Sequence, residues 1–179
     1  MSEFLHIVAI WTHVLGIALW VGPQFFLAFA WVPASRKIDD LPTRIAAMRT
    51  ITRRFAYIGG TGLALIVVAG TYLIFDWREY YAVPEETEFT SLRFGVVFIT
   101  KMTVFMVMLA AVALHMFVLG PRQLEKLEDR ARGLTVDDDE LRSIRMQSMM
   151  LSIAGLVLTL AIMVMGSMIG TASWSLQEL

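Results

Sequence analysis

Four long stretches with almost no charge restrict the fold of this chain more than any other feature of its sequence. They cover residues 7–32, 55–75, 94–119 and 149–170, and the third carries their only charged residue, Lys101. A helix needs about 20 apolar residues to cross about 30 Å of hydrocarbon. Inside lipid only helices and closed barrels satisfy their own backbone groups, and the alternation typical of strands is absent here. The stretches therefore predict four transmembrane helices.

Composition supports the same interpretation. Of the 179 residues, 57% are apolar and only 17% are charged, which is more apolar surface than a small soluble domain buries. We predict an all-α, polytopic membrane protein whose single domain, residues 1–179, is an antiparallel bundle of four transmembrane helices. These helices should cover residues 5–33, 54–76, 92–119 and 143–171. The lack of cysteine excludes disulfides and thiolate ligands, and a net charge of -1 provides no basic surface for nucleic acid.

The distribution of basic residues between the stretches predicts the orientation of the chain. Residues 34–54 carry six basic residues against two acidic ones, and residues 120–148 carry six basic residues beside seven acidic ones. Residues 76–93 are mainly acidic instead. Lysine and arginine accumulate on the cytoplasmic side of membrane proteins, and acidic residues contribute little to this rule. We therefore predict a plasma (inner) membrane protein with loops 34–54 and 120–148 in the cytoplasm and both termini outside it.

Polar and small residues fall on one face of each predicted helix, and in lipid such a face points toward other helices. The spacings of three, four and seven residues place each set on one side of a helix. The four sets are His6, His13, Gly16, Trp20 and Gln24; Tyr57, Thr61, Ala64, Val68 and Thr71; Lys101, Met108 and His115; and Ser148, Ser152, Gly155, Thr159, Met163, Gly166 and Gly170. The glycines should let helices approach closely.

Two local features have structural interpretations. Pro23, beside Gly22, should kink the first helix and free a backbone carbonyl that Gln24 could satisfy. The four acids at 137–140 lack the glycine and the spaced ligands of a calcium-binding loop, so they are interpreted as a solvated helix start.

Ionisable residues within the predicted spans are harder to attribute to packing alone. Lys101 should lie about 10 Å from the end of its helix, where it can pair, snorkel or serve a pathway. His13 enters from the same side at a comparable depth. Thr71 and Tyr72 of the second predicted helix and residues 163–168 of the fourth, beginning with Met163, fall in the same layer, so we expect that these residues could share one site with Lys101 and His13. His115 lies near the other end of its helix, level with Arg54. The difference in depth, about 15 to 20 Å, argues against one iron bound by both histidines.

Two kinds of centre fit these residues, and a third interpretation needs none. A five-coordinate haem b could use His13 or His115 as its axial ligand, with Arg54 near the propionates. Copper(I) prefers soft thioether donors, and the methionine count of 12 is high. Alternatively, the histidines are hydrogen-bonded core residues and the methionines fill apolar gaps. The candidate cofactor-binding residues are His13, Lys101, His115 and Arg54, and the candidate metal ligands are His13, His6, Met108 and Met163.

Several landmarks carry a family resemblance over residues 6–122. In chain order they are His13, the run Ala18-Leu19-Trp20-Val21-Gly22, Pro33, Arg53-Arg54-Phe55, Gly70, Arg93-Phe94-Gly95, Lys101 and Pro121-Arg122. With these landmarks the chain resembles the membrane domain of the copper-resistance D (CopD) family, which implies copper handling. The first-helix histidine, the arginine opening the second helix and the lysine and histidine of the third are also similar to the HemJ-type protoporphyrinogen oxidases. That resemblance implies a b-type haem with His13 as its ligand.

Three functional hypotheses follow. The leading one is a CopD-like membrane protein that handles copper through a metal or metalloporphyrin site in its helices. The alternative is a haem b redox protein of the HemJ type, in which Lys101 or Arg54 binds carboxylates. The second alternative is an accessory or structural subunit without a cofactor, which packs against membrane-protein partners or copies of itself in the bilayer. Whether the chain is an enzyme stays open between these hypotheses.

Overall fold

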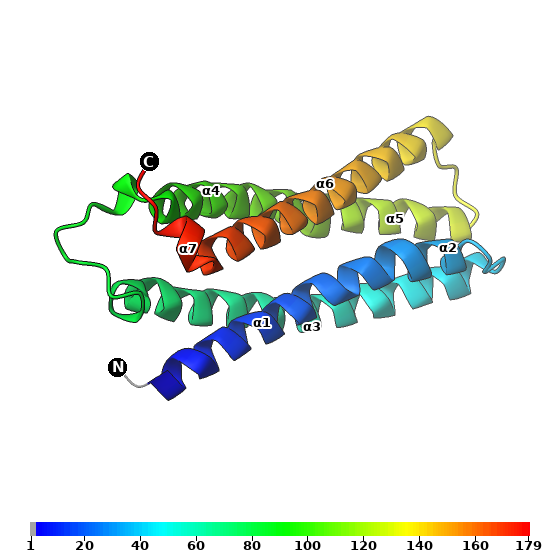
Figure 1. Ribbon diagram of the computed structural model, residues 1–179. Helices are drawn as coiled ribbons and strands as arrows, with labels where there is room; N and C mark the ends of the chain where they lie inside the picture. Colours follow the sequence, from blue (N-terminus) through cyan, green and yellow to red (C-terminus); the bar gives the residue numbers. More distant parts are fainter. Residues whose placement is uncertain (1–2) are drawn as a thin grey trace. The chain divides into compact units, whose positions relative to one another are not determined.

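The computed structural model describes residues 3–179, and the elements formed by these residues are all helical (Figure 1). Four helical segments are long and apolar enough to cross a membrane: Glu3–Ser35, Leu41–Tyr80, Arg93–Ala131 and Asp138–Gly170. The predictions of an all-α chain and of four helices long and apolar enough to span a membrane are thereby confirmed. The chain divides into two compact units, an N-terminal unit, Met1–Glu85, and a C-terminal unit, Glu86–Leu179. Each unit contains two of the long helical segments.

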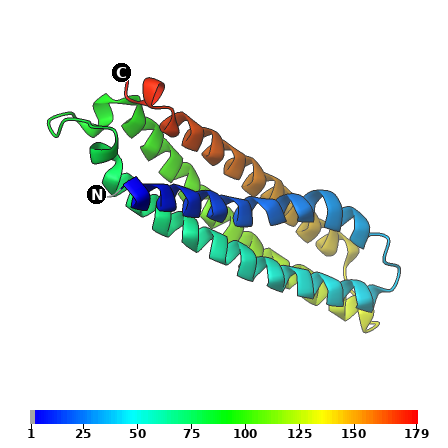
Figure 2. The same ribbon diagram turned by 60° about the horizontal axis from the view of Figure 1, so that its bottom comes forward.

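In the N-terminal unit, α1 (Glu3–Phe25) continues through a π-helix (Phe26–Trp31) into α2 (Val32–Ser35), and α3 (Leu41–Tyr80) returns alongside α1 (Figure 2). The helix α3 begins well before the predicted residue 54. Asp40 caps its first turn by accepting a hydrogen bond from the backbone N–H of Thr43 at 2.9 Å, and Pro42 suits the first turn. Hydrogen bonds from the side chain and backbone of Thr43 lower the pKa of Asp40. Most of the predicted loop 34–54 is therefore helical.

Close approach of two glycines determines how α1 packs on α3. A Cβ atom added to Gly16 would lie 2.7 Å from the carbonyl oxygen of Gly62, and one added to Gly62 would lie 2.8 Å from the carbonyl oxygen of Gly16. The predicted packing role of these small residues is confirmed at this crossing. The predicted inward face of the second helix is not the face that packs on α1, because Tyr57 and Val68 on that face are 68% and 70% exposed.

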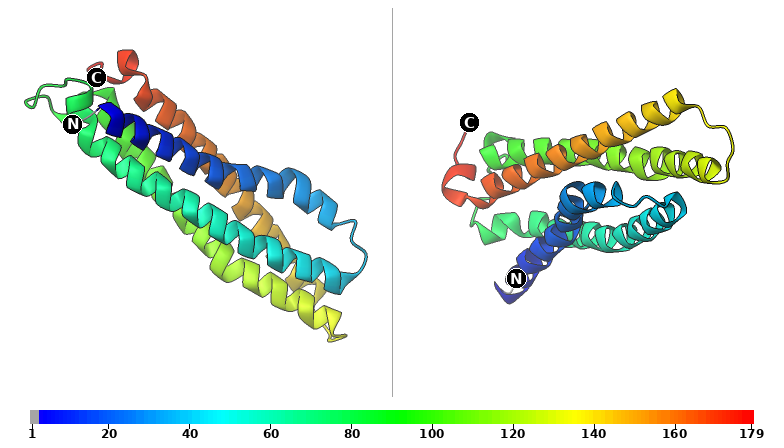
Figure 3. Two further views of the ribbon diagram at one scale, coloured as in Figure 1. Left: turned by 90° about the horizontal axis from the view of Figure 1, so that it is seen from below. Right: turned by 90° about the vertical axis from the view of Figure 1, so that its right-hand side faces the viewer.

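In the C-terminal unit, a 3-10 turn (Phe89–Ser91) leads into α4 (Arg93–Leu114), a π-helix (His115–Leu119) and α5 (Gly120–Ala131). The next helix, α6 (Asp138–Gly170), packs against α4, and a short α7 (Ala172–Ser175) follows it (Figure 3). Asp137 caps α6 by accepting hydrogen bonds from the backbone N–H groups of Asp139 and Glu140. The interpretation of the acidic run as a helix start is confirmed. Because α5 and α6 extend beyond the apolar stretches, most of the predicted loop 120–148 is also helical.

Both π-helical segments lie directly before a proline in the first turn of the following helix. These prolines are Pro33 of α2 and Pro121 of α5. Proline lacks an N–H group and crowds the carbonyl four residues earlier, and a wider turn is one way to accommodate this within a continuing helix. Pro23 lies inside α1, which continues to Phe25, and the kink expected there stays a prediction. Gln24 donates a hydrogen bond to the backbone carbonyl of Trp20 at 3.2 Å, as expected for a side chain beside this proline.

The end of the chain is fastened to the start of α4. The backbone N–H of Arg93 donates to the carbonyl of Gln177 at 3.0 Å, and that of Leu179 donates to the carbonyl of Ser91 at 3.0 Å. The Arg93 guanidinium also lies over the Trp174 ring, 5.3 Å from its centroid. This contact positions Trp174 beside α4.

Candidate functional site

His13 is the most informative of the candidate ligands. Its Nδ1 lies 3.0 Å from the backbone carbonyl oxygen of Ile66, on α3. A carbonyl can only accept a hydrogen bond, so Nδ1 carries the proton and donates it. In the neutral imidazole the lone pair is then on Nε2. Metal-ligating histidines are commonly oriented in this way, by a carbonyl or carboxylate on the other ring nitrogen.

Gly70 of α3 makes room for the His13 ring. A Cβ atom added to Gly70 would lie 3.1 Å from Cε1 and 3.3 Å from Nδ1 of His13. These separations are too short for a relaxed van der Waals contact, so a larger residue would push the ring away from its carbonyl acceptor. The glycine therefore helps to fix the imidazole orientation.

A second histidine, His6, forms a buried pair with an acid. Its Nδ1 lies 2.5 Å from Oδ2 of Asp76, and both residues are buried between α1 and α3. The ring of Tyr80 stacks on the imidazole with centroids 3.6 Å apart and an angle of 6°. The prediction that His6 lies on the inward stripe is confirmed, but its partner was missed. Asp76 was the last residue of the predicted helix 54–76 and was counted with the acidic residues that follow it, whereas it lies within α3 at 5% exposure.

Two buried polar atoms of the N-terminal unit have no hydrogen-bond partner among residues 3–179. They are Nε1 of Trp20 and the hydroxyl oxygen of Tyr72. Trp20 packs on Gly59 of α3, and Tyr72 lies one helical turn before Asp76. A buried polar atom without a partner costs free energy, so these two atoms are groups that a ligand or water could satisfy.

The predicted stripe of the third helix points toward α6 within the C-terminal unit. Nζ of Lys101 would be 3.9 Å from a Cβ atom added to Gly166, and Met108 is only 2% exposed. Nδ1 of His115 lies 3.3 Å from the hydroxyl oxygen of Ser148. Ser148, Gly155 and Thr159 of the predicted fourth stripe are buried, whereas Met163 is 38% exposed.

The predicted ligands are divided between the two units. His6, His13 and the exposed Arg54 belong to the N-terminal unit, and Lys101, His115 and the two methionines belong to the C-terminal unit. The site shared by His13, Lys101 and Met163 therefore stays a prediction. Across residues 3–179, no three side chains of the His, Cys, Asp and Glu types are grouped as a metal site. A site that includes methionine thioethers stays a prediction as well.

The arrangement can do two things chemically. It offers the oriented imidazole of His13, with its lone pair on Nε2. It also offers a buried hydrogen bond between Asp76 of α3 and His6, which lies seven residues before His13 on the same face of α1. The imidazole of His13 could ligate a metal ion or a haem iron. The hydrogen bond to Asp76 fixes the orientation of the His6 ring. Comparison with protein-family models, curated proteins and solved structures finds no match for this chain.

Proposed function

We propose that the chain is a CopD-like integral membrane protein that holds haem b through Nε2 of His13. Four helices would cross the plasma (inner) membrane as an antiparallel bundle, with both termini outside the cytoplasm, as the basic residues of 34–54 and 120–148 indicate. The observation that carries the cofactor proposal is the hydrogen bond from His13 Nδ1 to the carbonyl of Ile66. It orients the ring and places the lone pair of the neutral imidazole on Nε2, the nitrogen through which the proposed ligation would occur.

Haem is favoured over a lone copper ion by the number of protein ligands each requires. A porphyrin supplies four nitrogen ligands itself, so one imidazole is enough to hold the iron. Copper needs several protein donors. Among the interactions described for residues 3–179, only His13 has its Nδ1 hydrogen-bonded to a backbone carbonyl, so a second histidine oriented in the same way is not found there. When bound, haem supplies one-electron redox chemistry. Lys101 or Arg54 would bind carboxylates of the porphyrin or of a substrate, as the HemJ resemblance implies.

The test is an absorption spectrum and metal analysis of the full chain, purified from membranes. We expect a Soret band and about one iron per chain. His13→Ala should remove both, whereas His115→Ala should retain them, because His115 contacts Ser148 instead of an α3 carbonyl. A wild-type protein with neither haem nor metal would overturn the proposal, and so would a full Soret band in His13→Ala.

Copper handling is the second candidate, and the burial of Met108 on the helix face that carries Lys101 favours it. In that case metal analysis should find copper without a Soret band, and Met108→Leu should lower the copper content while His115→Ala should not. A stoichiometric membrane-protein partner, without haem or metal, would instead support the accessory-subunit hypothesis and overturn both metal proposals.

A further inference from the structure

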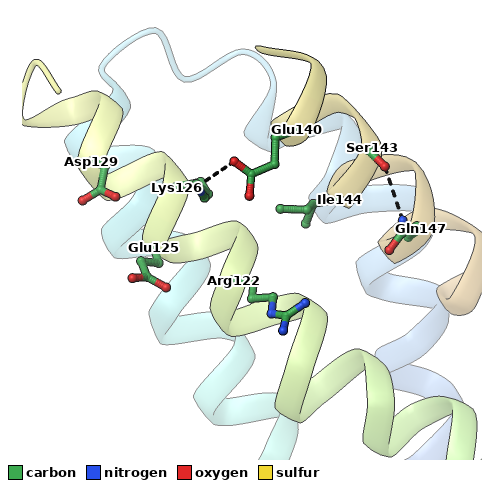
Figure 4. A pocket seen from close by; sticks show the side chains of 8 residues that line it. All are labelled: Arg122, Glu125, Lys126, Asp129, Glu140, Ser143, Ile144 and Gln147. Carbon is green, nitrogen blue, oxygen red and sulfur yellow. Dashed lines mark hydrogen bonds and ion pairs between the residues drawn. The ribbon is translucent and has the colours of Figure 1, made fainter. Parts of the chain in front are cut away.

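A polar cleft lies between α5 and α6, at one end of the C-terminal unit. Its volume is about 540 Å³, which is within the range of small-ligand sites. Arg122, Glu125, Lys126 and Asp129 line it from α5, and Glu140 and Gln147 line it from α6 (Figure 4). Two cationic side chains and three carboxylates thus line one cleft. Their order along the helices indicates which kind of ligand the cleft could bind.

The cleft begins where the apolar stretches end. Arg122 comes three residues after the stretch 94–119, and Gln147 comes two residues before the stretch 149–170. Both residues therefore lie at the edge of the hydrocarbon if the apolar helices span it. Asp129, seven residues beyond Arg122 on the same helix, should lie about 10 Å farther into water. The cleft thus extends from the lipid boundary outward.

Some of the charged side chains in the cleft form ion pairs with each other, and among residues 3–179 Arg122 does not. Nζ of Lys126 donates to Oε2 of Glu140 at 2.7 Å and so bridges α5 and α6, as Figure 4 shows. Arg130 and Asp138 form a second bridge farther along. Arg122 has no hydrogen bond or ion pair in the part of the chain that the structure describes, and its side chain extends from α5 toward the α6 side of the cleft (Figure 4). A guanidinium is thus available at the lipid boundary, with carboxylates beyond it.

We propose that this cleft binds the headgroup of phosphatidylethanolamine. The phosphate of a phospholipid lies next to its glycerol, at the lipid boundary, where Arg122 can donate two parallel N–H groups to it. The primary ammonium lies farther into water, where Glu125 and Glu140 can accept its hydrogen bonds. A purely anionic headgroup would meet three carboxylates, and a choline headgroup has no N–H to donate. The order of charges therefore selects a phosphate followed by an ammonium.

This inference depends only on the C-terminal unit and on the spans, and it needs no cofactor at His13. The test uses the full chain in detergent micelles, incubated with equal amounts of phosphatidylethanolamine, phosphatidylcholine and phosphatidylglycerol of the same acyl chains. Native mass spectrometry then measures the lipid that each chain retains. We expect preferential retention of phosphatidylethanolamine, reduced about tenfold by Arg122→Gln. Arg132→Gln, at the exposed end of α5 and outside the cleft, should have no effect.

Two further experiments test whether headgroup recognition, rather than misfolding of a variant or binding of free phosphate, explains the result. Glu125→Gln should reduce the preference for phosphatidylethanolamine over phosphatidylcholine while helicity by circular dichroism stays unchanged. Inorganic phosphate, at the concentration of the lipid, should not displace it. Equal retention by Arg122→Gln and the wild type would overturn the proposal. Stronger retention of phosphatidylglycerol would overturn it too, since the cleft would then be a general anion site.

Discussion

His6 and Asp76, seventy residues apart in the chain, meet in the interior of the N-terminal unit with Nδ1 and Oδ2 2.5 Å apart. The contact joins the first turns of α1 to the last turns of α3. Together with the glycine crossing farther along, it fixes which residues of the two helices face each other. The stacked ring of Tyr80 covers the pair.

Removal of either partner should destabilise the protein strongly, because the other is left buried without its hydrogen bond. We expect Asp76→Ala to cost about 3 kcal/mol. The combined variant His6→Ala with Asp76→Ala should cost much less than the sum of the two single changes. Thermal unfolding in micelles, followed by circular dichroism, measures all three. Glu3→Gln, on the exposed side of α1, is the control, and purely additive effects would show that the two side chains do not interact.

The glycine crossing gives a second prediction. Gly16→Ala and Gly62→Ala should each destabilise the N-terminal unit by about 1 to 3 kcal/mol, because the new methyl group would meet the backbone of the opposite helix. Gly22→Ala and Gly60→Ala are matched controls on the same helices, where a Cβ atom meets nothing within 4 Å. These controls should be neutral or slightly stabilising, since alanine favours helix. Equal melting temperatures for all four variants would contradict the observed packing.

Gly95 gives a third prediction, in the C-terminal unit. Its added Cβ would lie 1.8 Å from the carbonyl oxygen of Phe89, so the loop before α4 would have to move. We expect Gly95→Ala to lower the melting temperature and to increase proteolysis between residues 82 and 92. Gly170→Ala, where the added atom meets nothing within 4 Å, is the control. A Gly95→Ala protein with unchanged stability and unchanged cleavage would show that the loop adapts without cost.

Part of the fold could be predicted from the sequence, because a long apolar segment in lipid must form a helix that satisfies its own backbone groups. The helical class, the number of spans and the inward stripe of α1 followed from apolar length and periodicity. The ends of the helices did not, because capping by Asp40 and ion pairs such as that of Lys126 with Glu140 extend helices beyond the hydrocarbon.

The candidate site was predicted less completely, for a related reason. Hydropathy treats an acid as the end of a span, and the predicted second helix therefore stopped at Asp76, although the spacing of four from Tyr72 and Tyr80 is helical. The face of α3 that contacts α1 is the face on which Gly59 and Gly62 allow the two helices to approach closely. Near these glycines polar residues do not mark this face, so a search for polar stripes does not find it. The orientation of His13 depends on a carbonyl of another helix, which residue types alone do not locate.

The hydrogen-bonded cap of α3 by Asp40 predicts that stability depends on pH, and substitution of Asp40 can separate this effect from that of other charges. Hydrogen bonds from Thr43 lower the pKa of Asp40 below its ordinary value of 3.8, so its stabilising effect is present above that value and is lost as pH falls through the lowered pKa. The melting temperature of the wild type should therefore exceed that of Asp40→Asn at pH 6, and the difference should shrink as the pH is lowered below 4. Asp39→Asn, one residue earlier, serves as the control for a general charge effect. A difference that stays constant down to pH 2.5 would mean that the charged carboxylate contributes nothing beyond the neutral amide at the start of α3.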